Sequence, residues 1–169
     1  MEFEIVHEFE ASLDALELAV LSPNLIDKLA PRLPNVEQVR QTEHTLENGV
    51  LTRVLSYQAD VKIPAFARGY VTREMCAWDE RFVYTIKSHW SEWTILPKIK
   101  REWRKHFGAA GTYALVASPG ATTKRIVKGS VAIKAPPGLR HLAERMIVNE
   151  VRKIFDAEAD ILRGLATLV

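Results

Sequence analysis

The end of the chain constrains the fold more than any other segment. After Pro136-Pro137-Gly138, no glycine or proline follows until Gly164. A stretch of this length is too long for one strand and is typical of a helix. Its apolar residues recur at helical spacing and form one broad face, which consists of Leu139, Ala143, Met146, Ile147, Val151, Ile154, Ala157, Ile161 and Leu165. Such a helix has to pack against an apolar surface, and we expect that surface to be the concave side of a sheet.

The first residues predict a strand followed by two short helices. The odd positions from Phe3 to Phe9 are apolar or histidine and alternate with glutamates, interrupted only by Val6, a period of two that is typical of a half-buried strand. Ser12 is a suitable cap for a helix that Ser22-Pro23 ends. A second short helix is expected over residues 24–33, where prolines close it.

The middle of the chain has the period of strands. The expected strands cover residues 36–46, 50–63, 66–78, 81–90, 111–118 and 122–135, with turns at Asn48-Gly49, Asp79-Glu80 and Pro119-Gly120. This order predicts an antiparallel meander. Residues 95–107 fit both a basic helix with an apolar stripe and a strand. Because Pro97 and the dense charge suit a central strand poorly, we expect an irregular or partly helical crossing that leads into a strand at Gly111.

Composition limits the class of protein. With 169 residues, 47% apolar content and a net charge of +2, the chain is expected to form one domain, 1–169, and not a disordered segment or a dedicated nucleic-acid binder. Cys76 is the single cysteine, so no internal disulfide forms and a reducing compartment is expected. Neither a secretory leader nor an apolar stretch long enough to span a membrane is apparent, and we expect a cytoplasmic protein.

Four short motifs carry a resemblance to a known superfamily. They are residues 108–113 (GAAGTY), residues 129–136 (GSVAIKAP), Ala143-Glu144-Arg145 and residues 156–159 (DAEA). Together with the order of elements, they resemble the START-like (SRPBCC, helix-grip) superfamily, which includes the birch-pollen allergen, polyketide cyclases and the PRELI-type lipid-transfer proteins. The likeness is strongest to an uncharacterised bacterial family. The order of elements covers nearly the whole chain, but the motifs mark the fold and carry no chemistry.

The resemblance implies an α+β helix-grip fold. In this fold a curved antiparallel sheet of about six or seven strands wraps around the long C-terminal helix, and two short helices follow the first strand. An apolar cavity between sheet and helix holds a lipid, sterol or polyketide in relatives, so we expect an apolar ligand here and no cofactor. The alternative is that large side chains fill the cavity: Tyr57, Phe66, Tyr70, Trp78, Phe82, Tyr84 and Trp90.

Three polar residues occupy positions where the pattern predicts apolar ones. They are His7, Arg53 and Glu150, and each needs a partner, water or a ligand headgroup if it is buried. Arg53 and Glu150 would satisfy each other as a pair inside the cavity, or Arg53 would hold an acidic headgroup. The alternative is that all three reach solvent at the ends of the sheet. The predicted ligand-binding residues are therefore His7, Arg53, Tyr57, Tyr84, Trp90 and Glu150.

Other kinds of site find little support in the sequence. The five histidines are scattered and no cysteine pair accompanies them, so no metal site is expected. No nucleophile elbow, phosphate-binding loop or dinucleotide-binding motif occurs.

A basic run predicts a membrane-contacting surface. Its cations and one tryptophan would meet anionic headgroups: Lys98, Lys100, Arg101, Trp103, Arg104 and Lys105. Contact with nucleic acid and an ordinary solvated basic face are the competing interpretations.

Three functions remain open at this point. The first is a non-catalytic carrier or sensor of a small apolar ligand, such as a lipid or fatty acid. The second is an enzyme of the cyclase or dehydratase type, in which a titratable pair in the cavity transfers protons to a polyketide-like substrate. The third is a protein-interaction module with a filled cavity. The sequence favours the first.

Overall fold

The computed structural model describes residues 1–33, 35–60, 76–99, 104–134 and 137–167. It contains seven strands in the described part, β1 (Glu2–Phe9), β2 (Val36–Glu47), β3 (Val50–Ala59), β4 (Ala77–Thr85), β5 (Trp90–Pro97), β6 (Phe107–Ser118) and β7 (Thr122–Ile133). The helices are α1 (Leu13–Leu21), α2 (Leu25–Leu29) and α4 (Pro137–Ala166), with the 3-10 turns η1 (Ala30–Arg32) and η4 (Ile86–Ser88). Among the described residues, no helix is both long enough and apolar enough to cross a bilayer.

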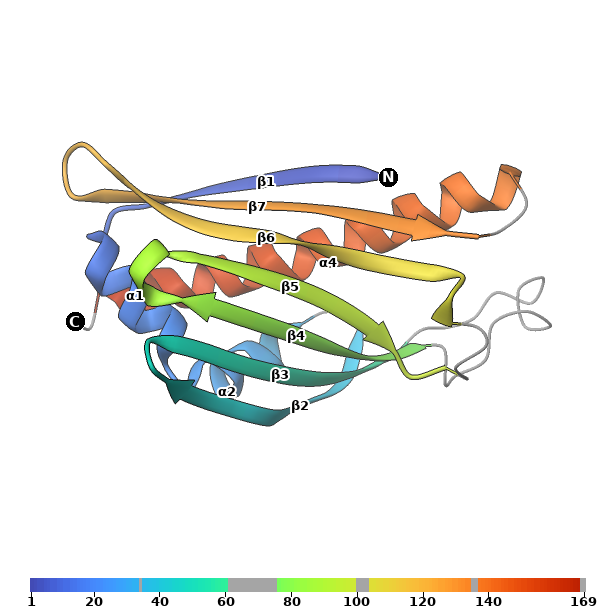
Figure 1. Ribbon diagram of the computed structural model, residues 1–169, viewed down its shortest axis with the longest axis horizontal. Helices are drawn as coiled ribbons and strands as arrows, with labels where there is room; N and C mark the ends of the chain where they lie inside the picture. Colours follow the sequence, from blue (N-terminus) through green and yellow to red (C-terminus); the bar gives the residue numbers. More distant parts are fainter. Residues whose placement is uncertain (34, 61–75, 100–103, 135–136, 168–169) are drawn as a thin grey trace.

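The strands form one antiparallel sheet in the order β1-β7-β6-β5-β4-β3-β2. The sheet curves along α4, and α1 and α2 lie at the end where α4 finishes (Figure 1). Both short helices contact α4, and α4 also contacts β7 and β1. The predicted α+β helix-grip architecture, with a curved sheet and one long C-terminal helix, is confirmed.

Local signals placed two hairpins correctly. Asn48 and Gly49 have φ of 51° and 75° and connect β2 to β3. Gly120, with φ of 80°, lies between β6 and β7. The Ser12 hydroxyl accepts a hydrogen bond from the Ala15 amide at 3.2 Å and caps α1, as its position predicts.

The turn expected at Asp79-Glu80 is wrong. Both residues lie inside β4, where they pair with β3 and β5, and the chain turns instead at η4 and at His89, whose φ is 51°. Acidic residues are common in turns, but here Asp79 points outward while Glu80 lies on the inner face, and neither breaks the pairing. Of the strand expected over residues 66–78, only Ala77 and Trp78 belong to β4; residues 66–75 lie outside the described part.

The segment 95–107 also differs from the expectation. Strand β5 continues to Pro97 and β6 begins at Phe107, four residues before the expected start at Gly111. Pro97 is tolerated because β6 pairs with β5 only as far as Ile95, so one side of the chain at Pro97 carries no partner strand. Residues 100–103 lie outside the described part.

Two glycines allow a tryptophan to lie against the sheet. Gly111 on β6 and Gly129 on β7 are paired across the strands. A Cβ atom would stand 1.9 Å from the Lys128 carbonyl oxygen at Gly111 and 2.3 Å from Cζ2 of Trp93 at Gly129. The Trp93 side chain, which is 1% exposed, fills this space and contacts Phe3 and Phe155. The two positions therefore require residues without a side chain.

One face of α4 closes the interior. Its buried apolar residues are Val148, Val151, Phe155, Ala159, Ile161, Leu162 and Ala166. Two glutamates, Glu144 and Glu158, lie buried on the same side of the helix. Buried carboxylates at these positions need specific partners. Glu158 and its partners form the centre of the candidate site.

Candidate functional site

Two arginines bind one glutamate in the interior, between the sheet and α4. Arg53 comes from β3, Arg125 from β7 and Glu158 from α4. The Nη2 atom of Arg53 lies 3.2 Å from Oε1 of Glu158, and Nη1 of Arg125 lies 2.8 Å from Oε2. All three residues are buried. Each carboxylate oxygen thus receives one charge-assisted hydrogen bond, and the cluster joins both halves of the sheet to the helix.

The two guanidinium groups also lie over aromatic rings. The Cζ atom of Arg53 is 4.8 Å from the ring centre of Phe82. That of Arg125 is 5.8 Å from Phe9, 5.5 Å from Tyr113 and 5.7 Å from Phe155. Cation–π contacts in a desolvated site offset part of the cost of burying a second positive charge. One carboxylate still faces two guanidinium groups here.

Three hydrogen-bond donors in this cluster lack an acceptor. They are Nε of Arg53, Nε of Arg125 and the Tyr113 hydroxyl, each buried and without an acceptor among the described residues. The Tyr113 oxygen is close enough to Arg125 to accept from it, but a guanidinium cannot accept the hydroxyl proton in return. A buried donor without an acceptor costs roughly 1–3 kcal/mol. The cluster therefore suits a group that offers lone pairs, such as a carboxylate, a carbonyl or water.

His7 extends the cluster towards the surface. Its Nδ1 atom lies 3.1 Å from Nη2 of Arg125, which can only donate, so Nδ1 is the accepting nitrogen. The Nε2 atom then donates to Oδ1 of Asp156 at 2.8 Å. Burial and the neighbouring Arg125 charge lower the pKa of His7. His7 is thus a neutral residue with a fixed tautomer at neutral pH.

A second acid lies on the inner face of β4. The carboxyl group of Glu80 is hydrogen-bonded to the Tyr57 hydroxyl. Burial, followed by the charge of Glu158, raises the pKa of Glu80 to about 7. The Tyr57 ring stacks on Trp78 with ring centres 5.0 Å apart. Glu80 and Tyr57 form a titratable pair within hydrogen-bond reach beside the arginine cluster.

A third group of polar residues fastens α1 to the sheet. The Tyr84 hydroxyl donates to Oε1 of Glu17 at 2.7 Å, and Nδ1 of His89 lies 2.8 Å from the same oxygen. Tyr84 also packs against Phe82 and Tyr113. Since these rings are at most 3% exposed, large side chains fill the interior next to α1.

Four of the six predicted ligand-binding residues lie in the interior. His7, Arg53, Tyr57 and Tyr84 have the positions described above, and their role in ligand binding stays a prediction. Trp90 is 37% exposed on the outer side of β5. Glu150 is exposed and pairs with Lys153 at 2.7 Å.

The Arg53–Glu150 pair, one of the possibilities raised by the sequence, does not form, and Glu150 reaches solvent as in the alternative interpretation. The reason is that the buried face of α4 is centred one residue further along the chain than the sequence indicated. Each residue turns a helix by about 100°. This rotation brings Glu158 inward to Arg53 and leaves Glu150 in solvent.

Three residues of the site were missed from the sequence. Arg125 lies between Thr123 and Val127 on the buried face of β7. Arg53 was singled out as a charged residue on the buried face of a strand, and the same criterion would have found Arg125. Glu80 was hidden by the turn expected at Asp79-Glu80. Glu158 was missed because the apolar face of α4 was assigned one position early.

The basic run separates into different environments. Lys98 lies 3.1 Å from Asp79 and also donates to the Ser56 hydroxyl. Nε of Arg104 donates to the Ile99 carbonyl oxygen at 3.1 Å. Lys100, Arg101 and Trp103 lie outside the described residues. Lys105 belongs to a groove of about 780 Å³ between the start of β6, the end of β7 and α4.

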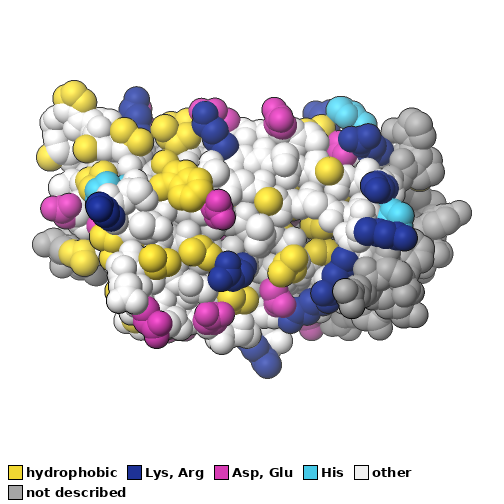
Figure 2. All heavy atoms as spheres, viewed as in Figure 1, with side chains coloured by type: hydrophobic (Ala, Val, Ile, Leu, Met, Phe, Trp, Pro, Cys, Tyr) yellow, Lys and Arg dark blue, Asp and Glu magenta, His cyan; other side chains and the backbone are white. Residues whose placement is uncertain are grey.

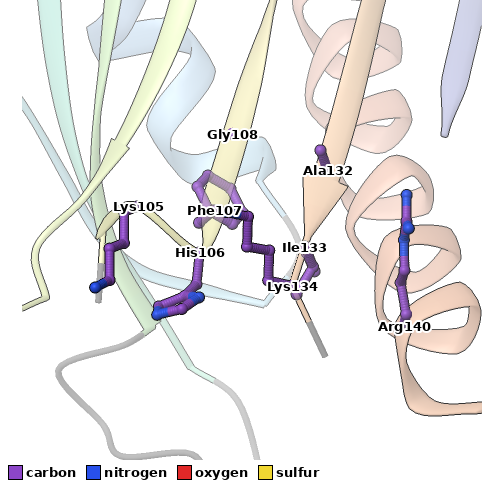
Figure 3. A pocket seen from close by; sticks show the side chains of 8 residues that line it. All are labelled: Lys105, His106, Phe107, Gly108, Ala132, Ile133, Lys134 and Arg140. Carbon is purple, nitrogen blue, oxygen red and sulfur yellow. The ribbon is translucent and has the colours of Figure 1, made fainter. Parts of the chain in front are cut away.

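Figure 3 shows the side chains around this groove. Phe107, Ala132 and Ile133 supply its apolar part, while Lys105, Lys134 and Arg140 supply positive charge. The eight described residues that line it include no carboxylate.

Solved structures with the same architecture were found. A protein from Thermus thermophilus, TTHA0849, has a TM-score of 0.64 and 14% identity over 97% of this chain and 98% of its own. The ZhuI aromatase/cyclase from Streptomyces sp. R1128 has a TM-score of 0.65 and 15% identity over 99% of this chain and 93% of its own. The chain therefore shares the helix-grip fold of these structures.

Norcoclaurine synthase from Thalictrum flavum, solved with dopamine and hydroxybenzaldehyde, shares this helix-grip fold. Its TM-score is 0.64, with 14% identity over 96% of this chain and 86% of its own. No family model matches the chain, and no curated protein does. The resemblance inferred from the sequence is thus confirmed for the fold.

Proposed function

We propose that the protein binds a small, mainly apolar molecule between the sheet and α4, and that Arg53, Arg125 and Tyr113 hold one carboxylate or carbonyl group of this ligand. The observation that carries the proposal is the set of three buried donors without an acceptor, located next to the apolar core between the sheet and α4. The fold supports the same class of function, since two of the similar structures are named as enzymes of small organic molecules.

Charge favours an acidic ligand over a neutral one. Arg53 and Arg125 share one ionised carboxylate, that of Glu158. The raised pKa of Glu80 means that this acid is largely protonated below pH 7 and then adds no negative charge. A fatty acid or another apolar carboxylate would complete the charge balance and accept hydrogen bonds from all three donors.

Native mass spectrometry of gently purified protein, followed by uptake of a dansyl-labelled fatty acid and of its methyl ester, tests the proposal. We expect an adduct that organic extraction removes, and tighter binding of the acid than of the ester. Tyr113→Phe should weaken binding of the acid about tenfold, since a hydrogen bond to a charged group is worth roughly 1.5–3 kcal/mol.

Thr123→Val is the matched control for Tyr113→Phe. It also removes one buried hydroxyl, but that hydroxyl already donates to the Ala11 carbonyl oxygen at 2.8 Å, so ligand affinity should stay unchanged. A clean apo mass together with no uptake of either probe would contradict the proposal. Equal binding by wild type and Tyr113→Phe would remove the assigned role of the hydroxyl.

Glu80 and Tyr57 favour a second candidate function, proton transfer in an enzyme of the cyclase type. A carboxylate with a pKa near 7 is suited to remove a proton from a carbon between two carbonyls and to return it to the oxygen of the attacked carbonyl after ring closure. Incubation with a linear poly-β-ketone mimic, with ring formation followed by absorbance, tests it. Glu80→Gln should abolish turnover and leave binding of the mimic intact; ring formation at the wild-type rate would exclude the role.

A further inference from the structure

We propose that the start of α4 and the adjoining cationic groove form a docking surface for a membrane that contains anionic lipids. The surface is defined by Leu139, Leu142, Met146 and Arg145 on α4 and by Lys105, Lys134 and Arg140 at the groove. It lies at the end of the molecule opposite α1 and α2 and is independent of the ligand site in the interior.

The first observation is an apolar stripe that faces away from the domain. Leu139, Leu142 and Met146 are 55%, 53% and 57% exposed, although α4 already buries another face against the sheet. Their spacing of three and four residues places them on one side of the helix. Figure 1 shows this part of α4 at the end of the sheet opposite α1 and α2. A patch of large exposed apolar side chains marks an interaction site.

The second observation is the positive charge beside this stripe. Arg145 lies among the apolar residues along α4 and is exposed. Arg140 is exposed too, but its charge is partly compensated by the Glu144 carboxylate at 2.9 Å. Lys105 and Lys134 line the neighbouring groove, and its described lining includes no carboxylate. Figure 2 shows Lys and Arg side chains gathering on this end of the drawn face. Cations that flank apolar side chains match the headgroups and acyl chains of an anionic bilayer.

The third observation is that side-chain contacts hold the start of α4 in place. Glu144 accepts hydrogen bonds from Arg140 at 2.9 Å and from the Ile133 amide at 3.2 Å, and it pairs with the terminal amine of Met1 at 3.4 Å. These contacts hold the pKa of Glu144 at about 2, well below its ordinary value. The carboxylate fixes the start of α4 to β7 and β1, so the apolar stripe keeps its direction.

The chemistry favours lipid over an acidic protein as the occupant. The apolar anchors are flexible Leu and Met side chains on α4, and the cations beside them come from separate elements of the chain. The groove is open and has room for a phosphate-bearing headgroup, with Phe107 and Ile133 as its apolar wall. A fluid headgroup layer adapts to cations that are spread over two elements.

Co-sedimentation of the full chain with vesicles tests the proposal. Vesicles of phosphatidylcholine alone are compared with vesicles that contain phosphatidylglycerol, at low and at high salt. We expect binding to the anionic vesicles only, weakening as salt rises. Lys105→Gln combined with Lys134→Gln should weaken binding about thirtyfold, since each cation near the surface contributes about one factor of five. Leu139→Ser with Leu142→Ser and Met146→Ser should abolish it.

Matched variants away from this surface serve as controls. Lys87 and Lys124 are exposed cations, and Leu18 and Leu46 are exposed apolar residues. Lys87→Gln with Lys124→Gln, and Leu18→Ser with Leu46→Ser, should bind vesicles as the wild type does. Far-UV circular dichroism verifies that every variant is folded.

Each contrary outcome would overturn the proposal. These outcomes are no sedimentation with anionic vesicles, equal sedimentation with neutral ones, and unchanged binding by the α4 variants. Displacement of the protein from vesicles by millimolar inorganic phosphate alone would assign the groove to a free anion and also contradict membrane docking.

Discussion

The guanidinium group of Arg125 has no exposed surface, and its Nη1 atom lies 2.8 Å from Oε2 of Glu158. This pair links β7, which lies between β1 and β6 in the sheet, to α4. The other bonds of the two residues, to Arg53, to His7 and to the Phe155 carbonyl oxygen, are all internal. Removing one member would therefore leave charges in the interior without compensation.

Glu158→Gln is expected to destabilise the protein by about 3–5 kcal/mol, because it leaves two buried arginines without their shared carboxylate. Urea unfolding at neutral pH, followed by circular dichroism, measures the change. Glu150→Gln is the matched control on the same helix, and its exposed position predicts a change within about 0.5 kcal/mol. Similar midpoints for the two variants would show that the buried cluster adds nothing to stability.

Glu80 predicts a fall in stability as pH rises. Its pKa of about 7 in the folded protein exceeds the ordinary value of 4.5, so between these pH values the folded state keeps a proton that the unfolded state has lost. The free energy of unfolding therefore decreases through this range and stays lower above pH 7. Glu80→Gln should abolish this contribution. Between pH 5 and pH 8, the free energy of unfolding of the wild type should therefore fall by about 2 kcal/mol relative to that of the variant.

The comparison between wild type and Glu80→Gln isolates this carboxyl from two other groups. His7, whose pKa is lowered, acts in the opposite direction, and Glu144 acts only below pH 4.5. Glu92→Gln, an exposed acid on β5, is the control and should follow the wild-type pH profile. A parallel profile for Glu80→Gln would mean that this carboxyl titrates normally.

Two tyrosines should respond differently to loss of the hydroxyl group. Tyr84→Phe deprives the buried carboxylate of Glu17 of a donor at 2.7 Å and should cost about 1.5–3 kcal/mol of stability. Tyr113→Phe removes a buried hydroxyl that has no acceptor among the described residues and should therefore raise stability by about 1–3 kcal/mol. Chemical unfolding of both variants side by side provides the measurement; the reverse order would contradict the assigned bonds.

The paired glycines predict a sharp contrast within β6. Gly111→Ala forces a Cβ atom against the Lys128 backbone and should lower stability by about 3 kcal/mol or more, because backbone cannot move aside as a flexible side chain does. Gly108→Ala, where a Cβ atom meets nothing within 4 Å, should change stability little. Differential scanning calorimetry of the two variants gives the comparison. Equal melting temperatures would refute the close approach.

Much of the fold is encoded in signals between near neighbours. The glycine-free run after Gly138 predicted α4, and the positive φ of Asn48 and Gly49 agrees with the expected hairpin. The same local reasoning failed at Asp79-Glu80, because two acids resemble a turn in the sequence while the pairing of β4 with β3 and β5 keeps them in a strand. Long-range pairing outweighed local preference there.

The site was only half predictable for a geometric reason. Arg53 was found because one strand's alternation identifies its inner face. Its partner Glu158 comes from α4, whose broad apolar pattern leaves the direction of the buried face uncertain by about one residue, or about 100°. Which acid meets Arg53 therefore depends on the rotation of the helix, and packing against β7, α1 and α2 fixes that rotation.

The strand order has a consequence for synthesis of the chain on the ribosome. Strand β1 is made first, yet its neighbour is β7, and Glu2 pairs with Ser130. The newly made strand β1 remains without its partner until most of the protein has emerged, and β6 also waits for β7. In nascent chains that stop before Thr122, β1 and one edge of β6 would lack the hydrogen-bond partners that β7 supplies. Such unpaired strands are bound by chaperones or pair with other chains and aggregate.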